Sequence, residues 1–198
     1  MNRPKVFLDL DRTIFDTDRA IEFWQVWAKY YDIVPEMCVA ERDQFYIWKD
    51  ETYMHDMSNQ LRSYGIDSNQ AYRQVIESEM SDGRLEMPYA SELVTWLKGV
   101  ADVAVLTYGP DDYQRCKAAL CLSLVGIPVV TTLQPKLEIL RESGDCWLID
   151  DKDLGLKPPD NIHFVQVISP DDIVVQDKSW PIYSSLKAVK EYLYENLH

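Results

Sequence analysis

The chain has 198 residues, which suits one domain or one domain carrying a modest insert. Hydrophobic residues make up 46% of it, enough for a core, so wholesale disorder is excluded. The formal net charge of -13 argues against a nucleic-acid groove and against attraction to an anionic membrane. It is compatible with binding of a divalent cation, although an acidic balance mostly reflects a solvated surface.

The cysteines and the first residues indicate the compartment. The chain has four cysteines, which are Cys38, Cys116, Cys121 and Cys146. They form no CxxC pair, and no histidine lies near them at the spacing of metal ligands. Scattered thiols of this kind are typical of a reducing compartment. The short apolar run before Asp9 does not look like a signal peptide, and no stretch is long enough for a membrane span. We therefore expect a cytoplasmic protein.

The first predicted elements are a strand and a set of helices. Residues 5–10, "KVFLDL", form a short apolar run that predicts a buried strand. The following stretch is amphipathic and rich in aromatic residues. It predicts helices over 18–31 with Asp18 as N-cap, from Pro35 through 51, and over 68–80 with Ser68 as N-cap. We therefore predict a helical insert over residues 17–83.

From residue 84 onward, predicted strands alternate with predicted helices. The strands are 101–107, 127–132, 146–150 and 162–169, and the helices are 87–100, 110–124, 135–143 and 182–197. This alternation indicates right-handed crossovers and a parallel sheet. We predict an α/β fold: a Rossmann-like three-layer α/β/α core from residues 1–16 and 84–198, with residues 17–83 as a small α-helical cap.

Polar side chains end nearly every predicted strand. In chain order they are Asp9, Asp11, Thr107, Asp150 and Asp151, and Lys136 opens the predicted helix just after the strand 127–132. Taken singly, each is more simply explained as a turn, cap or solvated residue. The carboxyl ends of parallel strands share one rim, where ligands bind. Two carboxylates ~4 Å apart repel by about 4 kcal/mol at an effective dielectric constant of 20, a cost that a bound cation offsets.

These residues resemble the motifs of the haloacid dehalogenase superfamily of phosphohydrolases. "DLDRT", starting at Asp9, looks like the first motif, DxDxT. Thr107 in "VLTYG" is similar to the second, Lys136 in "LQPKLEIL" to the third, and "LIDDKD" to the acidic fourth. The resemblance covers residues 5 to about 168. Many relatives carry a helical cap directly after the first motif, where the aromatic-rich insert falls here.

The resemblance implies Mg²⁺-dependent hydrolysis of a small phosphate monoester, such as a nucleotide or a sugar phosphate, through an aspartyl-phosphate. Asp9 would be the nucleophile, and Asp11 the general acid and then the general base. Thr107 would hydrogen-bond the phosphoryl group and Lys136 would neutralise its charge. Because a halide leaves without a proton, the presence of Asp11 favours a phosphate ester over a halogenated substrate.

The resemblance also implies a metal site and further substrate contacts. Mg²⁺ prefers oxygen ligands. Here they would come from the side chain of Asp9, the backbone carbonyl of Asp11, and Asp150 and Asp151. Two positions depart from the family pattern: Arg12 stands where glycine is frequent and could reach an anionic substrate, and Tyr108 stands where asparagine is frequent, next to Thr107.

The insert offers candidate substrate contacts of its own. Its many aromatic residues are explained first as the core of a small helical unit, and second as a wall that stacks on a flat substrate. Arg42, Lys49 and His55 could contact the substrate, although each also suits a solvated position. Hinges near residues 16–18 and near Gly83 would let the insert close over the site.

Three alternatives remain open. A phosphomutase or phosphotransferase of the same fold would pass the phosphoryl group to another hydroxyl. A signalling receiver domain also combines acidic residues, Thr and Lys around Mg²⁺, but its phosphorylated aspartate ends the strand before the Thr, and "ADVAVL" before Thr107 has no acid at its end. A non-catalytic phosphate-binding relative would lack some of the polar residues found here.

Overall fold

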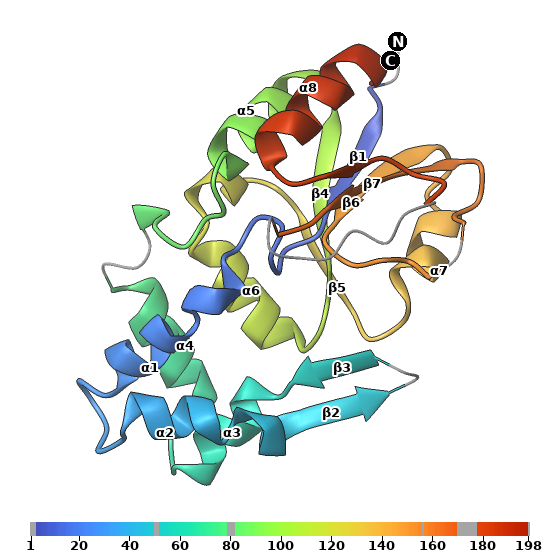
Figure 1. Cartoon of the computed structure of the whole chain (residues 1–198). Helices are drawn as coiled ribbons and strands as arrows, with labels where there is room; N and C mark the ends of the chain where they lie inside the picture. The colour runs from blue at the N-terminus through green and yellow to red at the C-terminus, as the bar shows by residue number, and fades with distance from the viewer. Residues whose placement is uncertain (1–2, 50–51, 79–81, 156, 170–177, 198) are drawn as a thin grey trace.

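The computed structural model describes residues 3–49, 52–78, 82–155, 157–169 and 178–197. Its centre is a six-stranded sheet in the order β5-β4-β1-β6-β7-β8, and every neighbouring pair is parallel. The strands are β1 (Lys5–Leu8), β4 (Asp102–Tyr108), β5 (Val129–Thr132), β6 (Cys146–Asp150), β7 (Ile162–Val167) and β8 (Ile182–Tyr183). In Figure 1 their carboxyl ends all point toward the insert.

Helices cover both faces of this sheet, which makes the three predicted layers. Side chains alternate between the faces along each strand. On one face Leu8 and Ile149 pack with α5 (Ala90–Val100), α6 (Asp111–Ala119) and α8 (Leu186–Asn196). On the other, Leu148 packs with Leu140 of α7 (Lys136–Arg141). The α/β fold with a parallel sheet is therefore confirmed.

The insert mixes helices with a β-hairpin. Its helices are α1 (Ile21–Trp27), α2 (Pro35–Ala40), α3 (Met57–Ser63) and α4 (Ser68–Ile76), with short 3-10 turns η1 (Thr17–Arg19) and η2 (Arg42–Phe45). The antiparallel hairpin pairs β2 (Tyr46–Lys49) with β3 (Thr52–His55) and lies across the end of the sheet in Figure 1. The predicted helix from Pro35 through 51 is thus wrong beyond Ala40, because aromatic and β-branched residues at 46–48 pair well across strands.

Several predicted boundaries also differ. Asp16, not Asp18, caps the turn before α1, and Asp67, not Ser68, caps α4 through the amide of Gln70 at 2.8 Å. The predicted helix over 110–124 ends at Ala119 and continues as the 3-10 turn η4 (Leu122–Leu124). The start of the last predicted helix is instead the edge strand β8.

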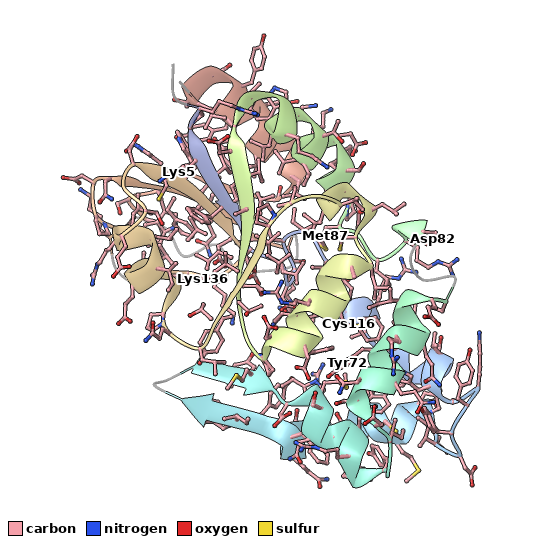
Figure 2. The ribbon with its side chains drawn as sticks, turned by 180° about the vertical axis from the view of Figure 1, so that it is seen from behind. Lys5, Tyr72, Asp82, Met87, Cys116 and Lys136 are labelled. Atoms are coloured by element: carbon pink, nitrogen blue, oxygen red, sulfur yellow. The ribbon has the colours of Figure 1, made fainter. Side chains whose placement is uncertain are left out.

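Large aromatic side chains hold the insert together and join it to the core. Phe23, Trp24 and Trp27 are fully buried, and Trp27 donates a hydrogen bond from Nε1 to the carbonyl of Ala71 at 2.9 Å. At the junction, Tyr72 of α4 stacks on Tyr113 of α6, with ring centroids 6.1 Å apart. Figure 2 shows Tyr72 and Cys116 on these two adjoining helices. The first explanation of the aromatic residues, as packing, therefore holds for those of α1.

None of the helices in the described ranges combines the length and the apolar character needed to cross a bilayer. All four cysteines are buried and free.

Candidate active site

The loop after β1 presents Asp9 and Asp11 at the end of the sheet. Asp9 extends the ladder, since its amide donates to the carbonyl of Ile149 on β6 at 2.8 Å. The chain then turns sharply, with the amide of Ile14 donating to the carbonyl of Leu10 at 3.0 Å. Arg12 sits in this turn with a φ of 57°, a left-handed conformation that glycine adopts at lower cost. Arginine therefore adopts a glycine-like backbone conformation at the position where the family pattern frequently has glycine.

Lys136 links Asp9, directly after β1, to Asp150 at the end of β6. From the first turn of α7, its Nζ lies 2.5 Å from Asp9 Oδ1 and 2.6 Å from Asp150 Oδ2. All three side chains are largely buried. Burial would lower the pKa of Lys136, but Asp150 and Asp9 raise it above its ordinary value, so the ammonium stays charged. Figure 2 shows Lys136 at the end of the sheet that faces the insert.

Asp151 completes an acidic cluster that suits a divalent cation. Ligand oxygens of Asp9, Asp150 and Asp151 all lie within 4.8 Å of one another. Burial, together with the neighbouring carboxylates, raises the pKa of Asp9 to about 7 and that of Asp151 to about 8. Asp151 Oδ1 is buried and has no hydrogen-bond partner in the part of the chain that the structure describes. Hard oxygen ligands carrying excess negative charge are what Mg²⁺ binds, so these residues fit that ion.

Thr107 carries a buried hydroxyl. It is near the end of β4, next to β1 in the sheet, and is completely buried. Its Oγ1 makes no hydrogen bond to the described residues. A buried hydroxyl without a partner costs about 1–3 kcal/mol, and such groups call for an explanation. A ligand oxygen beside the first motif would accept this hydrogen bond.

Asp11 is held apart from Asp9 by a lysine that the sequence analysis missed. Both oxygens of Asp11 lie 2.6 Å from Nζ of Lys117, a residue of α6 that is 3% exposed. Thr17 donates to the same carboxylate at 2.8 Å, and Gln114 at 3.3 Å. Burial alone would raise the pKa of Asp11, but the Lys117 ammonium and these hydrogen bonds lower it below 3.8. The resting carboxylate is therefore ionised.

The sequence did contain a signal for Gln114 and Lys117. They stand three residues apart on the helix that follows the second motif, so they share one face. That face also carries Tyr113 and Cys116, which made it look like an ordinary apolar stripe. Only the fold shows that this face of the helix lies against Asp11.

A cavity of about 330 Å³ lies between the insert and this rim. Asp11, Asp151 and Lys117 form part of its core side, and the hairpin supplies Tyr53 and His55. Of the predicted substrate contacts, Tyr108, Arg12, Arg42 and His55 line the cavity, whereas Thr107 and Lys136 do not. Arg12 forms an exposed ion pair with Asp18 at 3.2 Å. The side chain of Lys49 lies outside the described residues.

The structure thus brings one part of the predicted site into direct contact. Asp9, Lys136 and Asp150 touch, and Asp151 lies within ligand distance. Asp11 reaches the same rim, with its side chain turned to α6 instead. The metal and catalytic roles given to these residues remain predictions.

Comparison with known proteins bears on the fold. No family model and no curated protein matches the chain. Among solved structures, a protein described as a haloacid dehalogenase-like hydrolase from Burkholderia xenovorans LB400 is 15% identical, with a TM-score of 0.63 and 98% of both chains covered. The magnesium-bound HAD-hydrolase YfnB of Bacillus subtilis is 13% identical, with a TM-score of 0.59 over 98% of this chain and 99% of that one.

A third similar structure is described as a β-phosphoglucomutase from Thermotoga maritima. It is 12% identical, with a TM-score of 0.55 over 98% of this chain and all of the other. The chain therefore has the haloacid dehalogenase-like fold that its motifs predicted. Identities this low establish the fold, and different reactions are named among these structures.

Proposed function

We propose that the protein is a Mg²⁺-dependent phosphohydrolase that cleaves a small phosphate monoester through an aspartyl-phosphate. The observation that carries the proposal is the direct contact of Lys136 with both Asp9 and Asp150, with Asp151 within ligand distance. Thr107, near the end of β4 at the same edge of the sheet, has a hydroxyl with no hydrogen-bond partner among the described residues. Phosphoryl transfer needs positive charge, carboxylates and a hydrogen-bond donor around the phosphate. The ammonium of Lys136, the three carboxylates and the hydroxyl of Thr107 would supply them.

In the first step a carboxylate oxygen of Asp9 attacks phosphorus, and the bond from phosphorus to the ester oxygen breaks. Asp11, which is ionised at rest, first takes up a proton from the solvent and then passes it to the departing oxygen. Thr107 and Lys136 bind the phosphoryl oxygens. When bound by Asp9, Asp150 and Asp151, with the backbone carbonyl of Asp11, Mg²⁺ supplies positive charge that offsets the charge of nucleophile and phosphate.

In the second step Asp11 accepts a proton from water, which attacks phosphorus and frees Asp9 and inorganic phosphate. The contact between Asp11 and Lys117 supports this step, because it keeps the carboxylate ionised and oriented. Residues 17–83 would act as a cap that closes over the rim and excludes bulk water.

The proposal is tested with p-nitrophenyl phosphate in the presence of Mg²⁺ and of a chelator. We expect hydrolysis with Mg²⁺ only, and equal release of nitrophenol and inorganic phosphate. The variant Asp9→Asn should lose at least about 10³-fold in kcat while keeping its fold by circular dichroism. Full activity of Asp9→Asn would remove the proposed nucleophile, and nitrophenol without free phosphate would indicate a phosphotransferase.

A further inference from the structure

The cavity between insert and rim is lined by four cationic side chains and by three carboxylates, those of Asp11, Asp18 and Asp151. Its four cations are Arg12, Arg42, Lys117 and Lys152. Two of them are paired at the wall, Arg12 with Asp18 and Lys117 with Asp11. Among the described residues, no carboxylate lies within 4 Å of Arg42 or Lys152. In a chain of net charge -13, unpaired cations in one cavity call for an explanation.

Arg42 is the more enclosed of the two. It begins η2, and its guanidinium lies over the ring of Tyr46 at 5.6 Å from the centroid. Its Nε is buried and has no hydrogen-bond partner among the described residues. The adjacent carboxylate of Glu41 accepts a hydrogen bond from Tyr64 instead, and Asp43 is beyond ion-pair distance. The guanidinium is therefore held by the ring and the hydroxyl of Tyr46, and its Nε is left as a donor without a partner among the described residues.

His55, beside Arg42 in the cavity, does not compete for this role. Gln60 donates from Nε2 to the carbonyl of Cys38 at 2.6 Å, so its Oε1 accepts from His55 Nε2 at 2.6 Å. This arrangement assigns the proton to Nε2 and leaves Nδ1 as an acceptor. Burial lowers the pKa of His55 to about 4, despite the bond to Gln60, so the ring is uncharged near neutral pH. Arg42 is thus the charged donor on the insert side of the cavity.

Lys152 stands on the core side, directly after the acidic cluster. Its Nζ lies over the ring of Tyr53 at 5.8 Å, so a hairpin tyrosine backs this cation as Tyr46 backs Arg42. The two tyrosines are themselves in contact, with ring centroids 5.1 Å apart. The hairpin therefore carries a continuous aromatic wall with a cation at each end.

The cavity lies where the leaving group of a phosphate ester would bind. Asp9, Thr107 and Lys136 do not line it, so its volume of about 330 Å³ belongs to the leaving group rather than to the phosphoryl group.

We propose that the substrate is a small phosphate monoester whose alcohol part carries a second anionic group, a carboxylate or a phosphate, bound by Arg42. This inference rests on the proposed function, because it places the reacting phosphoryl group at Asp9. A guanidinium binds either anion through two parallel hydrogen bonds. Lys152 adds positive charge on the core side of the cavity.

The test compares three substrates on one carbon skeleton in the presence of Mg²⁺. Glycerol 3-phosphate has a neutral hydroxymethyl group where 3-phosphoglycerate has a carboxylate and glycerol 1,3-bisphosphate a second phosphate. We expect kcat/KM to be at least tenfold higher for one of the anionic compounds than for glycerol 3-phosphate, and the better one identifies the anion. Equal kcat/KM for all three, or a preference for the neutral compound, would overturn the inference.

Variants connect the preference to Arg42. Arg42→Met should reduce the ratio of anionic to neutral kcat/KM at least tenfold, and Arg42→Lys should retain part of it. Arg62→Met is the matched control, because Arg62 is an exposed arginine of the insert that does not line the cavity. Its ratio should equal that of the unmodified protein. A ratio that Arg42→Met leaves unchanged would contradict the assignment.

A binding experiment separates this inference from the proposed function. Calorimetry on the Asp9→Asn variant with Mg²⁺ compares the Kd of the same three compounds. If no monoester is hydrolysed by the unmodified protein, the proposed function fails, and the Kd values still decide the anion site. We expect the preferred anionic compound to bind at least tenfold more tightly than glycerol 3-phosphate, and equal Kd values would overturn the inference.

Discussion

Lys117 illustrates how one buried residue serves both folding and the candidate site. Its side chain is 4% exposed and its ammonium meets a carboxylate that is 28% exposed. The ring of Tyr113 also faces the ammonium, at 4.5 Å. A lysine buried to this extent is stable only when its charge is compensated. Asp11 supplies the compensation and is oriented in return.

We predict that Lys117→Met lowers the free energy of unfolding by about 2 to 4 kcal/mol, because Asp11 loses its ion-pair partner. It should also reduce kcat ten- to hundredfold, roughly the cost of a misplaced catalytic group. Denaturant unfolding and steady-state kinetics measure the two effects. The double variant Asp11→Asn/Lys117→Met should recover most of the stability but none of the activity.

The matched control is Arg115→Met on the same helix. Arg115 pairs with Asp111 at 2.8 Å, but both side chains are more than half exposed. An exposed pair of this kind contributes about 0–1 kcal/mol. Equal losses of stability for Lys117→Met and Arg115→Met would show that the buried ion pair contributes no more to the free energy of unfolding than the exposed one.

The turn between β4 and α6 sets the position of Gln114. Gly109 in this turn has a φ of 143°, and a Cβ there would lie 2.4 Å from Gln114 Nε2. That nitrogen is already bound to the carbonyl of Tyr108 at 2.8 Å and to Asp11. The side chain therefore cannot move aside without releasing the carboxylate of Asp11.

Gly109→Ala should accordingly lower stability by about 1–3 kcal/mol through backbone strain and also reduce turnover. Gly126→Ala is the control, since Gly126 has a φ of 80° but nothing within 4 Å of an added Cβ. Gly126→Ala should lose stability through the same backbone strain and keep its activity. Thermal unfolding and kinetics on both variants separate strain from displacement of Gln114, and an active Gly109→Ala would contradict this reading of the turn.

At the level of elements, the sequence predicted what depends on short-range pattern. The strands before Asp9, Thr107 and Asp150 were readable because each is a short apolar run ended by a polar residue. The pairing of β2 with β3 could not be read in this way, because the aromatic-rich sequence fits both a helical and a strand pattern. Its pairing partner decides between them, and pairing is a tertiary property.

The residues of the candidate site also fall into those that the sequence predicts and those that only the fold reveals. Residues at strand ends could be assigned to one rim from topology alone. Lys117 could not, because a helix face reveals its neighbour only when α6 is placed beside the loop after β1. Arg42 was predicted as a substrate contact, but only the placement of the insert on α6 shows that it lines the cavity. The contact between Tyr72 and Tyr113 fixes that placement.

The acidic cluster makes the stability of the whole folded protein depend on pH. Asp9 and Asp151, with pKa values of about 7 and about 8 against an ordinary 3.8, hold protons that the unfolded chain releases. Without metal, stability should therefore fall as the pH rises from ~4 to ~8. The lowered pKa of Asp11 acts in the opposite sense and only in acid, where its contribution is lost as the pH falls below 3.8.

We predict that Tm in the presence of a chelator is lower at pH 8 than at pH 5. Mg²⁺ should raise Tm at both, and more at pH 8, because fewer protons then compete for the carboxylates; at 100 times its Kd a ligand adds about 2.7 kcal/mol. Asp151→Asn should weaken the pH slope and the response to Mg²⁺. Calorimetric scans that show no pH slope in the chelator would contradict the raised pKa values.

The central claim is that Asp9 becomes covalently phosphorylated during turnover. Acid quenching of the protein during its reaction with p-nitrophenyl phosphate and Mg²⁺, followed by peptide mass spectrometry, tests it most directly. We predict a phosphoryl group on Asp9 that hydroxylamine removes and that Asp9→Asn lacks. Steady turnover with Asp9 unmodified, or with the phosphoryl group on another residue, would contradict the claim.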